Sequence, residues 1–394
     1  MVKTEAYIVA GKRTPIGAFL GSLAGVPAVQ LGAIALKAAI AQAGIRPDMI
    51  DELYFGNVIS ANLGQAPATQ VALAGGLPDT TPCTLINKVC ASGTKAVMLG
   101  ASAIMLGNAH LVAVGGMENM SQVPGYLPNY RGGVKYGNSE VLDGIVRDGL
   151  QDVYSGMMMG SAGEMCAEKY EISRQDQDEY AIRSYKLAEE SIKNGYFADE
   201  IAPVTYISGK DQVTVSTDEE PGRVKYDKIP TLKPAFKKEN GTITAANASK
   251  INDGGAALIL ASAEAVETHK LKPIARIVSF ADAARHPEWF TIAPADAIPL
   301  AAKRANLDIQ QIDLFEINEA FSMVPIVNQK ILNLSSDKIN VTGGAVAIGH
   351  PIGCSGARLV LTLAHALQTK GLKYGSVGIC NGGGGASALI LESV

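Results

Sequence analysis

Cysteine is scarce in this sequence, and the few cysteines follow neither a metal-binding nor a disulfide pattern. The 394 residues include five, at positions 83, 90, 166, 354 and 380, without a C-x-x-C pair or the spacing of zinc ligands. No secretory signal peptide is recognisable, and an odd number of cysteines fits a reducing compartment. We therefore expect a cytoplasmic protein, or a mitochondrial-matrix protein if a transit peptide has been removed.

The chain also lacks the patterns of nucleic-acid-binding and membrane proteins. Lys and Arg number 34 against 38 Asp and Glu, and both signs are scattered without a basic stripe. The longest apolar runs are too short or too rich in glycine to span a bilayer. A G-x-G-x-x-G sequence after the first predicted strand is absent, which argues against a dinucleotide site. We therefore expect no nucleic acid and no membrane as partners.

Glycine, in contrast, is abundant, with 42 residues that occur in clusters. Hydrophobic residues make up 47% of the chain and charged residues 18%, values typical of a compact globular protein. The length is sufficient for two domains and a sizeable core. Clustered glycines indicate tight turns and places where the backbone approaches a ligand closely.

Cys90 lies in the most distinctive stretch, 87–95, which reads Asn-Lys-Val-Cys-Ala-Ser-Gly-Thr-Lys. Apolar and small residues recur at helical spacing over 96–107, so the pattern predicts a helix that begins just after Cys90. Unpaired N–H groups and the helix dipole favour a thiolate at that position, and the thiolate is the nucleophilic form. A buried, inert cysteine is the alternative, and the local sequence leaves both open.

The order of predicted elements occurs twice along the chain. The first set consists of strands at 5–10, 50–58, 83–89 and 111–116, with helices at 28–44, 65–76 and after Cys90. The second set consists of strands at 274–280, 312–316 and 377–379, with helices at 294–306 and from 354. Three segments match at an offset of 262 to 265 residues, among them 91–95 and 354–358. Two βα-rich halves in the same order predict a duplicated α/β fold.

Residues 118–268 separate the two halves and are richer in Met, Tyr, Asp and Lys. The spacing predicts a helix over 174–194 in this region. Long structureless loops are rare in compact domains, so we interpret the region as an inserted domain that folds over the site. The chain then divides into 1–117, 118–268 and 269–394, with the first half resuming near the end of the insertion.

Four candidate site residues fall where predicted strands give way to loops or helices: Cys90, Asn318, His350 and Cys380. In parallel α/β sheets, sites form beyond the carboxyl ends of the strands. A thiol nucleophile needs a base, usually histidine, and a tetrahedral intermediate needs donors aimed at its oxyanion. The glycines at 382–385 can present bare backbone N–H groups for that purpose.

Each of these features also has a plainer interpretation. His350 alone fits a packed turn histidine, the glycine run fits a simple turn, and Cys380 fits a core residue. Their coincidence at equivalent edges of the two halves favours a catalytic site over separate structural roles.

Longer motifs then identify a family. NKVCASG at 87–93, NEAF at 318–321, GGAVAIGHPIGCSGAR at 343–358 and CNGGGGAS at 380–387 resemble those of thiolases, and the resemblance covers essentially the whole chain. It is closest to the acetyl-transferring members of the eukaryotic cytosolic and mitochondrial type. The resemblance implies two βαβαβαββ halves in a five-layered α-β-α-β-α core, with an inserted loop domain that binds coenzyme A.

The resemblance further implies a reversible Claisen condensation of two acetyl-CoA to acetoacetyl-CoA and CoA, without a metal or redox cofactor. Cys90 takes the acetyl group as a thioester, His350 activates Cys90, and Cys380 shuttles the proton of the second acetyl-CoA. His350 and a water held by Asn318 line one oxyanion hole, and the N–H groups of Cys90 and Gly382 form the other. Two holes are needed because charge develops on different oxygens in the two half-reactions.

The same resemblance assigns ligand contacts in the insertion. The expected coenzyme A contacts are Tyr185, Arg223, Lys228 and Ser249, with Met159 near the acyl group. Arg223 and Lys228 suit the adenosine-phosphate end, although a solvated basic pair is the plainer interpretation. Mitochondrial relatives also bind a potassium ion beside the coenzyme A pocket, and the matching positions here are Tyr185, Ala245, Ala246, Ala248 and Val346. A homotetramer, built as a dimer of dimers, is also implied.

Two positions depart from the relatives. Met158 replaces a histidine that many bacterial members have in the covering loop, and the acyl-pocket stretch carries Phe290. Phe290 and Met159 predict a short acyl range.

Three other functions are alternatives to the thiolase interpretation. A decarboxylating ketoacyl synthase of the same fold typically uses two histidines and lacks the CNGGGG motif. A non-catalytic acyl-CoA-binding protein would not need two thiols, and a cysteine hydrolase would have to admit water to its thioester.

Overall fold

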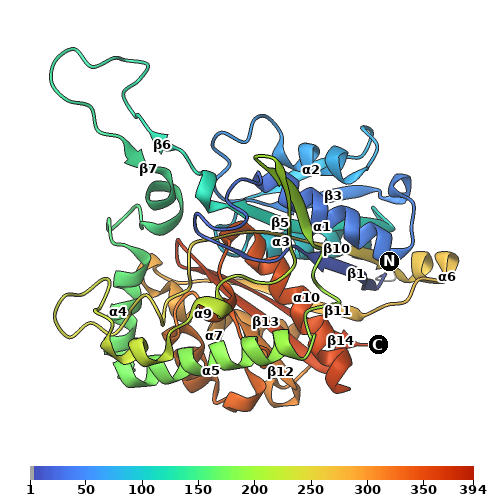
Figure 1. Ribbon diagram of the computed structural model, residues 1–394. Helices are drawn as coiled ribbons and strands as arrows, with labels where there is room; N and C mark the ends of the chain where they lie inside the picture. Colours follow the sequence, from blue (N-terminus) through green and yellow to red (C-terminus); the bar gives the residue numbers. More distant parts are fainter. Residues whose placement is uncertain (1–3) are drawn as a thin grey trace.

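Two helices that lie against each other form the centre of the molecule. The computed structural model describes residues 4–394. In it, α3 (Ser92–Met105) comes from the first half of the chain and α10 (Ile352–Lys370) from the second. Apolar side chains of both helices, Val97 and Leu359 among them, share one buried cluster with strands from both halves. The helix pair is therefore the middle layer of the fold (Figure 1).

One hydrogen-bonded sheet passes on both sides of this helix pair as two wings. In order of pairing, the first wing consists of β4 (Cys83–Ile86), β3 (Glu52–Gly56), β5 (Leu111–Asn119), β10 (Asn252–Ser262) and β1 (Ala6–Arg13), with the short β2 (Gly17–Ala18) beside β10. The second wing consists of β11 (Ala275–Ala284), β14 (Gly385–Ser393), β13 (Tyr374–Asn381) and β12 (Leu314–Ile317). The wings meet where β1 and β11 pair antiparallel.

The two wings repeat one strand order. The order β3-β5-β10-β1 in the first wing corresponds to β12-β13-β14-β11 in the second. In each wing the first of these pairs is parallel and the next is antiparallel. The duplicated α/β fold that the matched segments predict is thereby confirmed.

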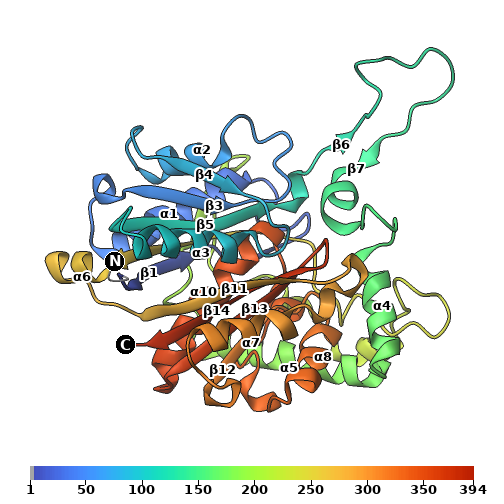
Figure 2. The same ribbon diagram turned by 180° about the vertical axis from the view of Figure 1, so that it is seen from behind.

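Helices cover the outer face of each wing and complete five layers. α1 (Ala28–Ala43) and α2 (Pro67–Gly75) pack on the first wing. α7 (Pro294–Arg304) and α8 (Met323–Leu332) pack on the second. All residues of β5 and β10 are buried, as expected of strands that lie between two helix layers. The predicted α-β-α-β-α order is confirmed (Figure 2).

The chain between β5 and β10 forms most of the predicted insertion. α4 (Met159–Lys169) and α5 (Arg174–Lys193) lie beside the second half (Figure 1). α5 begins at a capping box, in which the side chains of Ser173 and Asp176 accept hydrogen bonds from each other's backbone N–H. This part of the chain also forms the hairpin of β8 (Val204–Ser208) and β9 (Asp211–Val215). Two short helices, α6 (Ala263–His269) and α9 (Ala345–Ile348), come after β10.

Residues 127–141 form an arm that projects from the body (Figures 1 and 2). At its base, β6 (Gly125–Tyr126) pairs with β7 (Leu142–Asp143). On the arm, Tyr136 is 100% exposed and Tyr130 is 77% exposed. Exposed aromatic side chains grouped on a projection are typical of contact surfaces.

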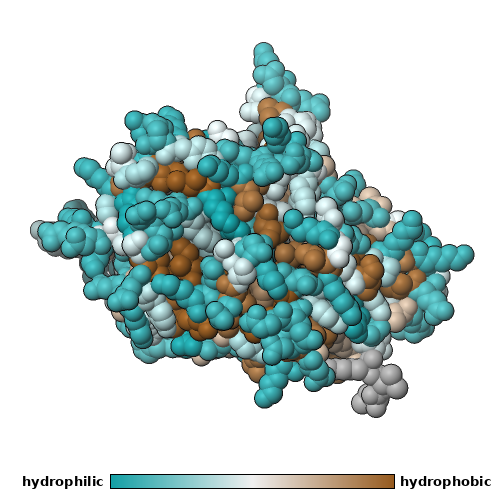
Figure 3. All heavy atoms as spheres, turned by 90° about the horizontal axis from the view of Figure 1, so that it is seen from below, coloured by the Kyte–Doolittle hydropathy of each residue, from teal (hydrophilic) through white to brown (hydrophobic). Residues whose placement is uncertain are grey.

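Within residues 4–394, every helix is too short or too polar to cross a bilayer. The face shown in Figure 3 carries hydrophobic residues in separate groups among hydrophilic ones.

Glycine allows the backbones of the two central helices to touch near their N-terminal ends. A Cβ atom on Gly93 would lie 2.5 Å from the backbone nitrogen of Ala357, and one on Gly356 would lie 2.3 Å from that of Thr94. The Thr94 hydroxyl donates a hydrogen bond to the carbonyl oxygen of Gly356 (3.1 Å). The two halves therefore meet backbone to backbone, at the points where each helix begins.

Gly356→Ala tests this contact. The added methyl group overlaps the backbone of α3, so we expect the free energy of unfolding to fall by about 1–3 kcal/mol, the usual cost of overpacking. The loss should occur even though alanine is the better helix former. Urea unfolding followed by circular dichroism measures it.

Gly25→Ala is the matched control, because a Cβ atom at Gly25 meets no atom within 4 Å. Its stability should stay within about 0.5 kcal/mol of the parent protein, as is usual for surface changes. Equal unfolding midpoints for the two variants would show that the helices tolerate a wider spacing.

Candidate active site

Side chains from both halves and from the insertion line a cavity of about 550 Å³. Met120 follows β5, and Phe321, His350 and Ile352 come from the second half. The insertion supplies most of the remaining wall, including Met158, Met159, Arg223, Phe236, Ser249 and Lys250. The volume lies within the range of roughly 300–1,000 Å³ that is typical of small-molecule sites.

The segment before α3 is folded into a tight turn that fixes Cys90. Val89 has a φ of 47°, in the left-handed region that β-branched residues rarely adopt. The Ser92 hydroxyl accepts a hydrogen bond from Lys88 N (2.9 Å) and donates one to Val89 O (2.6 Å). Asn87 Oδ1 accepts a further bond from Val89 N (3.0 Å). The motif thus holds a strained backbone next to the thiol, as is common at reactive sites.

Burial dominates the acidity of Cys90, and the helix start does not. Cys90 packs against an apolar cluster that includes Met120 and Ile352, two residues of the cavity wall. This burial raises the pKa of the Cys90 thiol to about 11, although the N–H groups of Gly382 and of Cys90 itself act in the opposite direction. We therefore correct the expectation of a resting thiolate: Cys90 is a thiol at neutral pH and needs a base.

Hydrogen bonds orient the imidazole of His350. Its Nδ1 lies 2.6 Å from Ser355 Oγ, and the same hydroxyl donates to Pro351 O (3.0 Å). Because the hydroxyl has a single hydrogen, it accepts from Nδ1–H, which leaves Nε2 without a proton. Asn318 Nδ2 lies 3.4 Å from Nε2, on the side of this free acceptor. Burial and the cation of Arg358 lower the pKa of His350 to about 3, so the ring is neutral.

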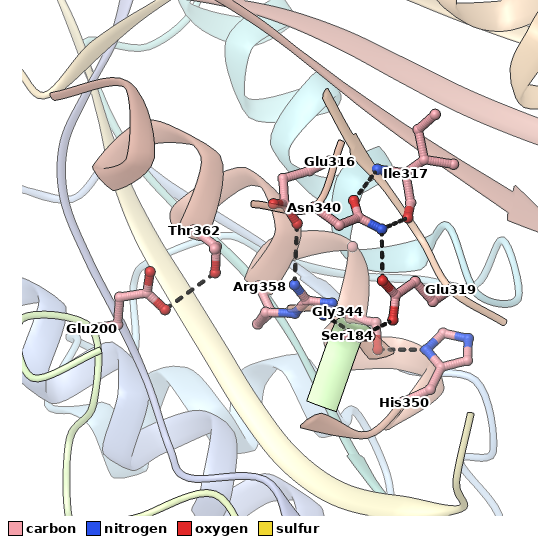
Figure 4. A network of polar contacts seen from close by, with 12 residues as sticks. Ser184, Glu200, Glu316, Ile317, Glu319, Asn340, Gly344, His350, Arg358 and Thr362 are labelled. Carbon is pink, nitrogen blue, oxygen red and sulfur yellow. Dashed lines mark hydrogen bonds and ion pairs between the residues drawn. The ribbon is translucent and has the colours of Figure 1, made fainter. Parts of the chain in front are cut away.

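A buried carboxylate fixes the loop that carries His350 (Figure 4). Glu319 accepts hydrogen bonds from the Ser184 hydroxyl (2.8 Å) and from Val346 N (3.0 Å). A Cβ atom on Gly344 would lie 2.3 Å from the Glu319 carboxyl carbon, so glycine is needed there. The glutamate of the NEAF motif is thus a structural anchor of the loop.

Asn252 holds His350 from the other side. Its Oδ1 accepts a hydrogen bond from His350 N (2.9 Å). Gly349 has a φ of 112°, and a Cβ atom on it would lie 2.5 Å from the Asn252 side chain. Only glycine fits between the two residues.

Cys380 stands near the end of β13 and is 1% exposed. Burial raises the pKa of its thiol, and the Cys90 thiol acts in the same direction. A Cβ atom on Gly382 would lie 3.5 Å from Val89 Cγ1, so the segments that carry the two thiols are adjacent. The N–H of Gly382 acts to lower the pKa of the Cys90 thiol. The turn itself depends on Gly384, where φ is 89° and a Cβ atom would lie 2.2 Å from Arg285 O.

Three of the residues expected to contact coenzyme A line the cavity: Met159, Arg223 and Ser249. Tyr185 does not line it, because the side chain is only 3% exposed and its hydroxyl accepts a hydrogen bond from Lys250. Lys228 also lies outside the cavity wall, exposed to solvent and 3.7 Å from Asp227. Lys250 lines the cavity where Tyr185 was expected, and no motif in the sequence points to it.

The positions expected to hold potassium are Tyr185, Ala245, Ala246, Ala248 and Val346. The ammonium of Lys250 donates to three of them, Tyr185 Oη (2.8 Å), Ala248 O (2.9 Å) and Val346 O (3.4 Å). A metal ion would need the same oxygens and would lie against a like charge. The residues of this chain therefore do not fit a potassium ion while Lys250 is in place.

Two other residues of the site were missed from the sequence, and each leaves a signal there. Ser355 follows His350 by five residues, a spacing at which the first turn of α10 returns its hydroxyl to the imidazole. Glu118 is a charged residue near the end of an otherwise apolar strand. Its carboxylate accepts hydrogen bonds from Val58 N and from Gly353 N (both 3.0 Å), so it joins the two halves.

Comparison with known proteins decides the family. The N-terminal domain of thiolases matches residues 6–264, and the C-terminal domain of thiolases matches residues 271–393. This chain belongs to the thiolase family. The resemblance noted in its motifs is thereby confirmed over nearly the whole length.

Several relatives of this thiolase carry a more specific name. A probable acetyl-CoA acetyltransferase from Dictyostelium discoideum is 54% identical over 99% of this chain and 94% of its own length. The acetyl-CoA acetyltransferase of Schizosaccharomyces pombe is 51% identical over the full length of both chains.

Solved structures agree with the fold. The Acat5 thiolase from Ascaris suum, in complex with coenzyme A, matches with a TM-score of 0.94 and 44% identity over 99% of this chain and 100% of the other. The acetyl-CoA acetyltransferase of Bacillus anthracis matches with a TM-score of 0.97 and 39% identity over the whole of both chains. The thiolase fold expected from the motifs is therefore confirmed.

The pH dependence of alkylation tests the state of Cys90 in this thiolase. With a pKa of about 11, the thiolate fraction should rise about tenfold per pH unit from pH 7 to 10. The rate of alkylation by iodoacetamide, followed by mass spectrometry of the Cys90 peptide, should rise in parallel. Cys90→Ser controls for labelling of the other cysteines. A rate that is already constant near pH 7 would show a resting thiolate paired with an imidazolium.

Proposed function

We propose that this thiolase is an acetyl-CoA acetyltransferase, which condenses two acetyl-CoA molecules reversibly to acetoacetyl-CoA and CoA. The observation that carries the proposal is the pair of neighbouring thiols, Cys90 and Cys380, next to a cavity that also contains the unprotonated nitrogen of His350. A nucleophile, a base and a second acid–base group are what two half-reactions on a thioester require. The names of the full-length relatives support the same activity.

In the first half-reaction, Cys90 Sγ attacks the carbonyl carbon of acetyl-CoA while His350 Nε2 takes the thiol proton. Burial keeps Cys380 protonated at rest, so its thiol can give a proton to the departing CoA sulfur. We assign to the N–H groups of Gly382 and Cys90, which act to lower the pKa of the Cys90 thiol, the role of donors to the oxygen of the acyl-enzyme. The products are an acetylated Cys90, free CoA, a protonated His350 and a Cys380 thiolate.

In the second half-reaction, the Cys380 thiolate removes a proton from the methyl group of another acetyl-CoA. The enolate oxygen is stabilised by the proton now on His350 Nε2 and by a water held by Asn318. Asn318 Oδ1 is buried and pairs with none of the described residues, which suits a bound water. The carbanion attacks the thioester, and Cys90 leaves and regains its proton from His350.

We propose a short acyl range, set by the apolar cavity wall near His350. Met159, Phe321 and Ile352 line this part of the cavity. Phe290, which was expected to border the acyl group, is instead packed in the outer core of the second wing and is 3% exposed. Phe290 can therefore limit the size of the acyl pocket only indirectly, by holding the residues next to it in place.

We also propose that the insertion, 118–268, binds coenzyme A between the halves 1–117 and 269–394. The insertion supplies Met159, Arg223 and Ser249 to the cavity wall, which supports this division. Arg223 and the exposed Lys228 suit the phosphates of the adenosine end, because both cations are near the surface. The chemistry itself uses no metal or redox cofactor.

A homotetramer, built as a dimer of dimers, is our proposal for the assembly. It is supported by the arm, whose exposed apolar and aromatic side chains include Tyr130, Val134 and Tyr136.

A cytosolic location is supported by a relative from Gibberella zeae, which is 52% identical and is named a cytosolic acetyl-CoA acetyltransferase. The mitochondrial matrix is the alternative.

Thiolysis of two substrates tests the activity and the acyl range together. Acetoacetyl-CoA should be cleaved with a kcat/KM about tenfold or more above that of 3-ketooctanoyl-CoA, because extra methylene groups meet the apolar wall. Loss of absorbance of the magnesium enolate measures both reactions. Equal specificity would contradict the short acyl range, and no cleavage of either substrate would contradict the proposed activity.

Cys380→Ala separates the two half-reactions. The variant should still gain one acetyl group on Cys90 when incubated with acetyl-CoA, because the nucleophile and the base remain and CoA can leave as a thiolate without the proton of Cys380. It should lose condensation, thiolysis and exchange of the acetyl protons with deuterated water, since positioned proton transfer contributes about 10²–10⁴-fold. Mass spectrometry and a coupled condensation assay measure these outcomes.

Cys83→Ala is the matched control, because Cys83 is a half-buried thiol on β4 that donates to Thr81 O, away from the cavity. It should keep all three activities. An unacetylated Cys380→Ala variant, or one with near-normal condensation, would refute this division of labour.

A further inference from the structure

A lysine ammonium lies where three oxygen atoms from three parts of the chain converge. Lys250 Nζ is 2.8 Å from Tyr185 Oη of α5, 2.9 Å from Ala248 O and 3.4 Å from Val346 O of α9. It also lies 5.5 Å from the centroid of the Tyr185 ring. An ammonium has three hydrogens, and each has its own acceptor here.

Burial and two carboxylates have opposite effects on the charge of the Lys250 ammonium. Glu220 and Glu319 favour the ammonium, while burial lowers the pKa of Lys250 to about 8, so the group is protonated at neutral pH. Glu319 is the carboxylate that also accepts from Val346 N. The ammonium therefore belongs to the polar network that positions the loop before His350.

The converging oxygens, two backbone carbonyls and a phenol oxygen, are cation ligands by their chemistry. Lys250 directly follows Ser249 in the chain, and its side chain runs along the cavity wall to these three oxygens, which we call the cradle. A chain without this side chain would present the same oxygens to a free monovalent cation.

We propose that Lys250 is a built-in monovalent cation, which ties the Ala248–Lys250 loop and α5 to the segment before His350 and makes the site independent of potassium. The relation to coenzyme A binding rests on the proposed function, because the loop forms the coenzyme A wall. The cation site itself does not depend on which reaction the protein catalyses.

Thermal unfolding in two salts tests the proposal without any substrate. The parent protein should melt at the same temperature in KCl and in choline chloride of equal concentration. Lys250→Gly should melt about 3–5 °C lower in choline chloride and recover most of this loss as KCl is added, because potassium then occupies the emptied cradle. Lys250→Met should melt lower in both salts and should not recover, since its side chain fills the cradle without a charge.

Lys238→Gly is the matched control, because it removes an exposed lysine of the same insertion. Its melting temperature should not respond to the choice of salt. The KM for acetoacetyl-CoA supplies a second measurement: it should be equal in both salts for the parent protein and should fall several-fold with KCl for Lys250→Gly. A failed activity assay with the expected melting behaviour would refute the proposed function and leave the cation site intact.

Three results would overturn the inference. The first is a parent protein that potassium stabilises above choline, which decides the matter even if the variants do not fold. The second is a Lys250→Gly variant as stable in choline chloride as the parent protein. The third is a destabilised Lys250→Gly variant that KCl does not restore, which would reduce Lys250 to a packing residue.

Discussion

The contact between the backbones of α3 and α10 is the constraint on which the rest of the structure depends. Gly93 and Gly356 leave no room for a side chain between the helices. Cys90 ends the turn before one helix, and His350 ends the loop before the other. Because neither helix can move without breaking this contact, it fixes the positions of Cys90 and His350 relative to each other. The two sheet wings and the outer helices pack around this pair of helices.

The chemistry then follows from exclusion of water. Burial opposes charge on every group of the site, so both thiols are held protonated and the imidazole is held neutral. These three groups carry no charge at rest, and in the proposed reaction charge appears on them only as protons move among Cys90, His350 and Cys380. Such an arrangement protects a thioester from hydrolysis, because a dry site offers few competing water molecules.

The duplication could be predicted from the sequence, because it depends on periodicity and on segments such as 91–95 and 354–358, which are visible without coordinates. The positions of Cys90, His350 and Cys380 at element ends could be predicted for the same reason. The five layers are implied only by the resemblance of the motifs to those of thiolases. Tertiary details could not be predicted. The burial that raises the pKa of Cys90, and the position of Lys250 in the cavity wall where Tyr185 was expected, depend on contacts between distant parts of the chain. The left-handed Val89 depends on hydrogen bonds within its own turn, which residue types alone do not reveal.

The position of β10 has a consequence for how the chain folds. β10 pairs with β1 on one side and with β5 on the other, yet it is synthesised more than a hundred residues after β5. Until it arrives, both neighbours have an unpaired edge, which is the surface most prone to wrong pairing between chains. Closing this sheet joins residues far apart in sequence, so folding should be slow and should depend on protection of the nascent first half.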